Sequence, residues 1–214
     1  MGLCASNQVM DFTTINDADS FRKYIEHCRH TNVYEKIKQK FRREKIIDAN
    51  DILTTGGEGP YNAFASLVSG DTPNRVDQSL LGEYSDKFML CHNNKPIRDE
   101  KWNDPDFAGA SMAGPDSNGP GHVFITTKNL HVDYFNILPI VLKKDVRFLE
   151  ELLYAAIEYS KNRGWTNPGF YFHTYPLNSV QSLHLHVINK DKLGPMFYKK
   201  NYSNLDIYDA LSVL

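Results

Sequence analysis

The chain has 214 residues, of which 41% are hydrophobic and 12% are aromatic, so it can bury a substantial core. Its net charge of −2 gives no global attraction to nucleic acid or to an acidic membrane surface. The three cysteines lack metal-site spacing, and no apolar run reaches the length of a membrane span or forms a signal peptide. We therefore expect a cytoplasmic protein with reduced thiols.

The first six residues read Met-Gly-Leu-Cys-Ala-Ser, which fits the pattern for N-myristoylation on Gly2. Cys4 is placed for palmitoylation, and a single myristoyl chain needs such a second signal for stable anchoring. A pattern this short also arises by chance. For a eukaryotic source we expect acylation at Gly2 and partial, peripheral membrane association.

Residues 1–59 are predicted to be a mostly helical N-terminal extension. Asp17 and Asp19 can cap a helix with apolar residues at helical spacing. A second helix follows and carries a Lys/Arg-rich face through Lys45, and such a face is most often simply solvated. The Gly- and Pro-rich residues 54–60 mark the predicted domain boundary, and they lack the Lys-Ser/Thr pair of a phosphate-binding loop.

Residues 60–192 are predicted to form the main domain, with 193–214 as a C-terminal tail. An apolar stripe from Val146 to Ile157 indicates a helix that ends at Gly164. Residues 97–120 contain one Asp-Pro and two Gly-Pro pairs, which predict a long loop able to cover an active site. We expect strands at residues 88–92, 123–127, 170–174 and 183–188. The predicted fold class is α+β, an antiparallel sheet with helices packed on one side.

The stretch Ser182-Leu183-His184-Leu185-His186-Val187-Ile188 alternates polar and apolar residues. Successive side chains of a strand point to opposite faces, so Ser182, His184 and His186 would share one face. Neutral histidine is a good nucleophile toward phosphorus and titrates near physiological pH. Two histidines at this spacing also occur on an ordinary solvated strand. No accompanying cysteine or histidine spacing indicates a metal site.

Three further segments lie upstream of this stretch, at residues 62–73, 88–96 and 121–128. In chain order, the four segments resemble the histidine-triad (HIT) superfamily of nucleotide hydrolases and transferases. They are similar to its opening helix and turn, its nucleoside-binding strand, its Gly-His-Val strand and its His-φ-His-φ-His-φ-φ signature, where φ is apolar. The resemblance covers about residues 60–192. It implies a HIT-like domain, a homodimer and no dissociable cofactor.

The resemblance also implies roles for single residues. His184 matches the histidine that attacks the α-phosphate and forms a nucleotidyl-histidine intermediate. His186 matches the histidine that orients this nucleophile and holds phosphate oxygens, and His122 matches one that lines the same pocket from the neighbouring strand. Ser182 replaces the first histidine of the signature, and its hydroxyl can still form a hydrogen bond. The predicted substrate-binding residues are Ser179 for phosphate, Asn93 for the ribose, His92 and Phe88 for the base, and Asn178.

Two smaller features are similar to particular branches of the superfamily. His173 and Pro176 match the His-x-x-Pro of aprataxin-like and decapping-like members. Lys192, Lys199 and Lys200 follow the signature, as lysines do in those branches. A zinc finger is not expected, because no cysteine or histidine pair follows His186, and this argues against DNA-end repair.

We therefore expect an enzyme, a nucleotide hydrolase or nucleotidyl transferase that cleaves a purine nucleotide at its α-phosphate. Candidate substrates are dinucleoside polyphosphates, nucleoside phosphoramidates, adenylyl sulfate and aminoacyl adenylates. The alternative is a catalytically weak nucleotide-binding protein, in which Ser182 marks lost chemistry and residues 1–59 carry a docking or regulatory function. No metal ligands are predicted.

Overall fold

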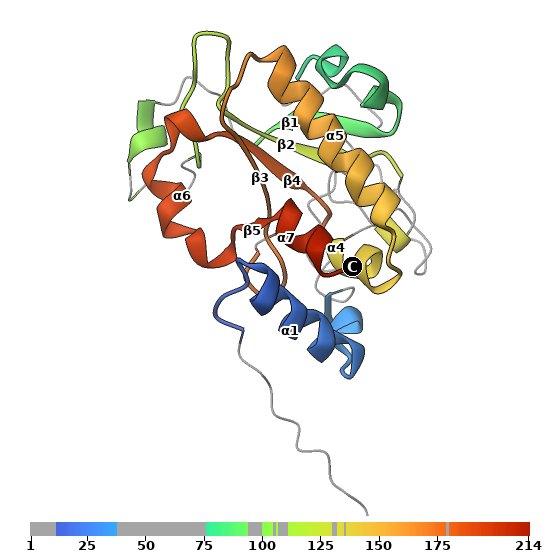
Figure 1. Ribbon diagram of the computed structural model, residues 1–214. Coiled ribbons are helices and arrows are strands. Elements are labelled where there is room, and N and C mark those ends of the chain that lie inside the picture. Colours follow the sequence, from blue (N-terminus) through green and yellow to red (C-terminus); the bar gives the residue numbers. More distant parts are fainter. Residues whose placement is uncertain are drawn as a thin grey trace, which may run out of the picture.

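The structure is a computed structural model that describes residues 12–37, 76–93, 100–104, 106, 111–129, 132–134, 136–178 and 180–214. Its described strands form one antiparallel sheet in the order β1-β2-β4-β3-β5 (Figure 1). The strands are β1 Phe88–His92, β2 His122–Thr127, β3 Pro168–Phe172, β4 Leu185–Asn189 and β5 Leu205–Asp206. The predicted α+β class with an antiparallel sheet is confirmed.

The α-helices with assigned bounds are α1 Ala18–Arg29, α4 Ile137–Leu142, α5 Val146–Asn162, α6 Pro195–Lys199 and α7 Ile207–Ser212. Residues 33–37 are also helical, and the rest of the second predicted helix lies outside the described residues. The 3-10 helices are η1 Gln78–Asp86, η2 Glu100–Asn103, η3 Val132–Tyr134, η4 Lys190–Lys192 and η5 Asn201–Ser203. No helix in the described ranges is long and apolar enough to cross a membrane.

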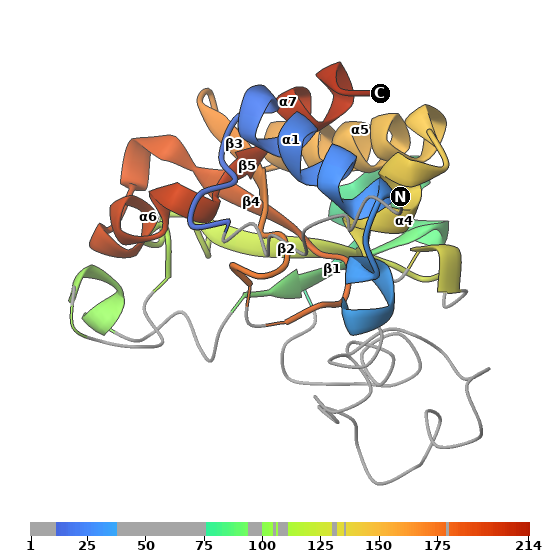
Figure 2. The same ribbon diagram turned by 90° about the horizontal axis from the view of Figure 1, so that it is seen from below.

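The longest helix, α5, lies across the sheet together with α1 and α7 (Figure 2). Asp145 caps its N-terminus by accepting a hydrogen bond of 3.1 Å from the N–H of Phe148. Gly164 has φ +69°, a left-handed conformation that ends the helix as predicted. Its apolar stripe is buried against the sheet, where each large side chain contributes about 1.5–3 kcal/mol. The buried members of the predicted stripe are Leu149, Leu152, Leu153 and Ala156, whereas Val146 is exposed and Ile157 is half-buried.

The N-terminal helix α1 shares the core of the sheet and α5. Asp17 and Ser20 form a capping box at its start, which confirms the predicted cap. Phe21 and Tyr24 are fully buried in the same hydrophobic cluster as the strands. The N–H of Ile15 also donates to the Tyr202 carbonyl at 2.8 Å. The part of the predicted extension that the structure describes is therefore built into the main fold.

The segment after residue 192, predicted as a C-terminal tail, contributes a strand and buried residues to the same sheet and core. β5 pairs with β3, with Leu205 opposite Phe172. Leu205, Ile207 and Ala210 have no exposed surface. A strand of two residues is too short to show an alternating pattern, so the sequence gives no periodic signal for it.

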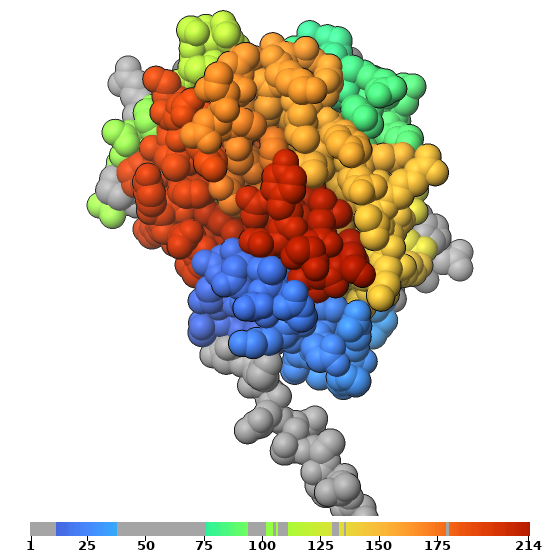
Figure 3. All heavy atoms as spheres, in the orientation of Figure 1, coloured from blue at the N-terminus to red at the C-terminus, as the bar shows by residue number. Residues whose placement is uncertain are grey.

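The two faces of the sheet differ in chemistry. Leu90, Ile125 and Val187 point toward α5 and belong to the main core, and Figure 3 shows how fully the helices cover this side. The strand register places His122, Phe124 and His186 on the opposite face, with Phe124 directly across from His186. The sheet therefore separates a helical, apolar side from a side that carries histidines.

Candidate active site

Four histidines meet on the sheet face opposite α5. His122 begins β2, His186 lies within β4, His184 directly precedes β4 and His173 directly follows β3. The ring centroid of His186 lies 5.2, 4.4 and 4.7 Å from the centroids of His122, His173 and His184. His186 therefore occupies the centre of the cluster.

A directed hydrogen-bond chain joins two of these histidines. The N–H of Met112 donates to Nδ1 of His122 at 3.0 Å, and the Ser111 hydroxyl lies 2.9 Å from the same nitrogen. A backbone N–H can only donate, so neutral His122 carries its proton on Nε2. This Nε2 lies 3.0 Å from Nδ1 of His186 and donates to it. His186 therefore keeps its own proton on Nε2.

The Nε2 atom of His186 is buried and has no hydrogen-bond partner among the described residues. Leaving a buried donor unpaired costs about 1–3 kcal/mol. A ligand oxygen placed against this N–H would remove that cost. The geometry therefore suits an acceptor such as a phosphate oxygen.

His184 has the opposite tautomer. Its Nδ1 lies 2.7 Å from the backbone carbonyl of Ser182, and a carbonyl can only accept. Nδ1 therefore carries the proton, and the lone pair lies on Nε2. The ring of Phe124 packs edge-on at 5.9 Å and restrains the imidazole. This tautomer is the one that a nucleophilic Nε2 requires.

His173 is held by Asn204. Its Nε2 lies 2.8 Å from Asn204 Oδ1, while Nδ2 of the same amide donates to the Phe197 carbonyl at 3.2 Å. These contacts fix the amide orientation and leave the proton of His173 on Nε2. Sequence reasoning noticed His173 but missed Asn204, which lies 31 residues away in the chain and belongs to no recognisable motif.

Burial lowers the pKa of every histidine in the cluster. The pKa falls to about 3 for His122 and to about 4 for His173, and that of His186 lies well below 6.5. Burial also lowers the pKa of His184, although its bond to the Ser182 carbonyl opposes the shift. Neighbouring histidines contribute, because a proton on one repels a proton on the next. The cluster is therefore neutral near pH 7.

The predicted shared strand face of Ser182, His184 and His186 needs correction. β4 begins at Leu185, so Ser182 lies in the preceding loop and contacts His184 through its backbone carbonyl. Asn178 also acts within this loop, where it donates to the Val180 carbonyl at 2.9 Å and accepts from Gln181 Nε2 at 2.7 Å. Its amide thus fixes the loop. Ser179 lies outside the described residues.

The structure does not bring Phe88 and His92 to the histidine cluster, which corrects their predicted role beside a base. Phe88 is fully buried on the helical face, with its ring 5.6 Å from that of Phe148. His92 is four residues further along β1 and so shares this face, where burial and the charge of Arg163 lower its pKa. Asn93 is half-buried just after β1 and forms no described hydrogen bond with the histidines.

The described second half of the predicted covering loop is anchored and does not form a lid. Ala113 pairs with Leu193, and the N–H of Gly114 donates to the Lys192 carbonyl at 2.8 Å. Most of the first half lies outside the described residues, as do Gly2, Cys4 and the segment 62–73. Residues 111–121 therefore form a fixed wall beside the histidines.

Within the described ranges, no group of three or more histidine, cysteine or acidic side chains is arranged to hold a metal ion. Two of the clustered imidazole nitrogens, His122 Nε2 and His186 Nδ1, are instead used in bonding to each other. Comparisons with protein-family models, with curated proteins and with solved structures found no match for this chain.

Proposed function

We propose that the protein is a nucleotide hydrolase or nucleotidyl transferase of the histidine-triad type, with His184 as the nucleophile toward an α-phosphate. The observation that carries this proposal is the 2.7 Å contact between His184 Nδ1 and the Ser182 carbonyl. It leaves the lone pair on Nε2 of an imidazole that burial keeps neutral. A neutral, oriented imidazole is what covalent catalysis at phosphorus requires.

The reaction then has two displacements. Nε2 of His184 attacks the α-phosphorus, so that an N–P bond forms while the bond from phosphorus to the leaving group breaks. The leaving group takes up a proton from water. A water molecule next attacks the same phosphorus, the N–P bond breaks, and a nucleoside monophosphate is released. In a transferase, another nucleophile takes the place of this water.

His186 supports both steps as a hydrogen-bond donor. Its buried Nε2–H is oriented by His122 and lacks a partner among the described residues. A non-bridging phosphate oxygen gains negative charge as the nucleophile approaches, and a preorganised donor stabilises that charge. His186 therefore stabilises the transition state, whereas the Ser182 carbonyl sets the tautomer of His184.

The replacement of the first signature histidine by Ser182 is compatible with this chemistry. The group that sets the tautomer of His184 is the backbone carbonyl, which every residue type at position 182 supplies. This favours an active enzyme over the alternative of a binding protein with a decayed site.

A substrate panel tests the proposal. Wild type is incubated with adenylylated and guanylylated phosphoramidates, polyphosphates and mixed anhydrides, and released AMP or GMP is measured. We expect His184→Asn to lower kcat by about 10³-fold or more, as for removal of other covalent nucleophiles. His30→Asn is the matched control, since His30 is exposed and pairs only with Glu26 among the described contacts. Binding of AMP or GMP without turnover of any substrate would favour the binding protein instead.

We also propose, from the N-terminal motif alone, that Gly2 is myristoylated in a eukaryotic cell and that Cys4 supplies a second acyl group. Labelling with a myristate analogue should mark wild type and not Gly2→Ala. Equal labelling of both proteins, or labelling of neither, contradicts this assignment.

A further inference from the structure

We propose that Arg163 and Asp116 form a positioning pair that holds the loop of Met112 against His122 and thereby sets the orientation of His186. Neither residue touches the histidine cluster. They lie beyond it, where the loop 111–121 meets the C-terminal end of α5. This inference rests on the proposed function for its catalytic consequence, but the orientation of His122 can be measured without any substrate.

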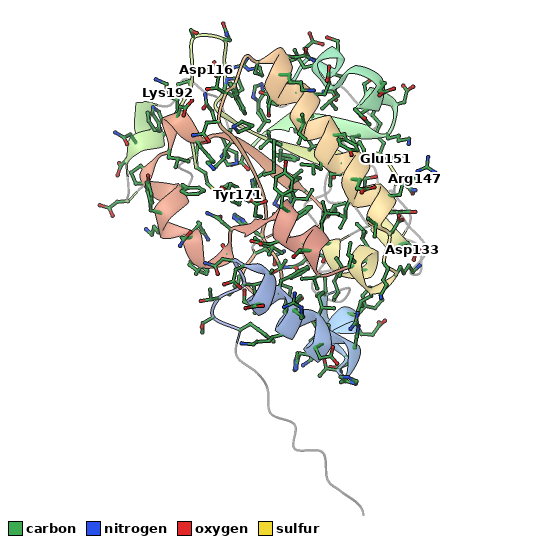
Figure 4. All side chains as sticks on the ribbon, viewed as in Figure 1. Asp116, Asp133, Arg147, Glu151, Tyr171 and Lys192 are labelled. Atoms are coloured by element: carbon green, nitrogen blue, oxygen red, sulfur yellow. The ribbon has the colours of Figure 1, made fainter. Side chains whose placement is uncertain are left out.

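Both side chains of the pair are buried, and each oxygen of the Asp116 carboxylate accepts a hydrogen bond. Arg163 Nη2 donates to Asp116 Oδ1 at 2.7 Å, and Trp165 Nε1 donates to Asp116 Oδ2 at 2.6 Å. The two charged side chains are only 8% and 13% exposed. Figure 4 shows Asp116 beside the end of α5, well separated along the helix from the labelled Glu151.

The same guanidinium fastens the turn that follows Asp116. It donates to the carbonyls of Asn118 and Pro120, while Asp116 accepts from the Asn118 N–H at 2.8 Å. Gly119 has φ +127°, and a Cβ at this position would lie 2.9 Å from Arg163 Nη1. The turn can therefore close on the guanidinium only because residue 119 has no side chain.

The two arms of this loop are the segments before and after its turn, and they bring the Met112 N–H to His122. One arm contains Met112, whose N–H donates to His122 Nδ1, and the other arm leads directly into His122. The arms touch each other, since a Cβ at Gly121 would lie 1.9 Å from the Gly114 carbonyl oxygen. A shift of the turn is therefore transmitted to the distance between Met112 and His122.

A buried ion pair is a poor device for stability alone, because desolvation offsets most of its attraction. Such a pair instead favours one geometry, since a guanidinium offers its donors in a fixed planar arrangement. Here those donors reach three acceptors in five residues of one turn. Such a cluster specifies one loop geometry, which suits a loop that orients a catalytic donor.

The test uses the full chain and two loss-of-contact variants. Asp116→Asn keeps the shape and removes the charge, and Trp165→Phe removes the indole N–H donor while keeping a smaller aromatic ring. Long-range ¹H–¹⁵N spectra of the imidazoles report which nitrogen of His122 and His186 carries the proton. We expect both variants to convert His122 from a single Nε2–H tautomer to a mixture. With a substrate that the wild type converts, kcat should fall by about 10- to 100-fold for Asp116→Asn, with KM nearly unchanged.

Two control variants separate positioning from general destabilisation. Glu151→Gln removes a surface carboxylate that pairs with Lys87 and Arg147, and it should alter neither readout. Leu149→Ala opens a cavity in the core and lowers stability without touching the loop. It should leave the His122 signals as in wild type.

The outcomes are distinct. A wild-type tautomer pattern in both Asp116→Asn and Trp165→Phe overturns the positioning role, as does an equal change of that pattern in Leu149→Ala. Failure of Asp116→Asn to fold leaves Trp165→Phe to decide by the same spectra. If wild type turns over no substrate, the proposed function fails, while the His122 signals still test the positioning pair.

Discussion

At the residue scale, the four clustered histidines differ in where they hold their protons. His122, His173 and His186 carry the proton on Nε2, whereas His184 carries it on Nδ1. Backbone groups and the Asn204 amide impose this difference. In the proposed reaction, His184 is thereby the nucleophile and its central neighbour His186 is the donor.

Substitution of Ser182 separates the contribution of its side chain from that of its carbonyl. Ser182→Ala keeps the backbone and should change kcat by less than about threefold. Ser182→Gly frees the backbone and should lower kcat further, because the carbonyl no longer holds Nδ1 of His184. Ser182→His should lower stability, since position 182 is only 2% exposed. A clear gain of activity in Ser182→His would instead indicate a decayed site.

The pH dependence of turnover follows from the lowered pKa of His184. In the proposed mechanism neutral His184 is the reactive form, and the lowered pKa extends the pH range of this form below the ordinary value of 6.5. We expect kcat/KM to stay level as the pH falls through 6.5 and to decline only in more acidic solution. Measurement from pH 4 to 8 on the best substrate of the panel tests this. A decline centred at or above pH 6.5 would contradict the lowered pKa of His184.

The residues of the site could be predicted only in part. His184, His186 and His122 stand in short alternating segments that sequence reasoning can find. The Ser182 carbonyl, the Met112 N–H and Asn204 could not be found, because two are backbone groups and the third has no motif. Phe88 and His92 were assigned to the site from their match to a motif. The alternation of side chains along β1 instead puts both on the sheet face that α5 covers.

At the element scale, the outer edge of β1 is covered by a side chain. Gln78 accepts from the Leu90 N–H at 2.9 Å and donates to the Leu90 carbonyl at 2.8 Å. Its amide thus makes the two bonds that a neighbouring strand would make. Exposed edges invite pairing with other chains, and this contact closes the middle of the edge.

Gln78→Ala should therefore weaken this edge. It leaves the Leu90 N–H without its acceptor, so the free energy of unfolding should fall by about 1–3 kcal/mol. Amide exchange at Leu90 should accelerate in the same variant. Asn162→Ala is the matched control, because it removes an amide that binds the Leu80 carbonyl at an exposed position. Unchanged protection at Leu90 in Gln78→Ala would show that Gln78 does not maintain the edge.

Four of the five strands were predicted, whereas α4, α6 and α7 were not, but the ends of α1 and α5 were predicted more accurately than the strand limits. The cap at Asp17, the stripe of α5 and its end at Gly164 follow from local spacing and are confirmed. Strand limits moved by up to two residues, because pairing partners and not local preference decide where a strand stops. β5 pairs only two residues and depends on β3, so its position is a property of the sheet.

At the scale of the whole molecule, the neutral histidine cluster makes stability depend on pH. The folded pKa values lie below 6.5, so the unfolded chain binds more protons in mildly acidic solution. The stabilisation is complete above pH 6.5 and is lost as the pH falls toward about 4 for His173 and about 3 for His122. Each histidine contributes a slope of up to about 1.4 kcal/mol per pH unit.

Urea unfolding at pH 7.5 and 5.5 measures this effect. Wild type should be less stable at pH 5.5, and His173→Gln should show a smaller difference between the two pH values. His30→Gln is the surface control and should retain the wild-type difference. An identical difference in wild type and His173→Gln would contradict the lowered pKa of His173.

The central claim is that His184 becomes covalently attached to a nucleotide. Wild type and His184→Asn are mixed with a turned-over substrate, quenched in alkali, digested and analysed by mass spectrometry. We expect one nucleoside monophosphate on the peptide that contains His184 in wild type, and none in His184→Asn. Product release with no adduct under any quench time, or an adduct on a different residue, would contradict it.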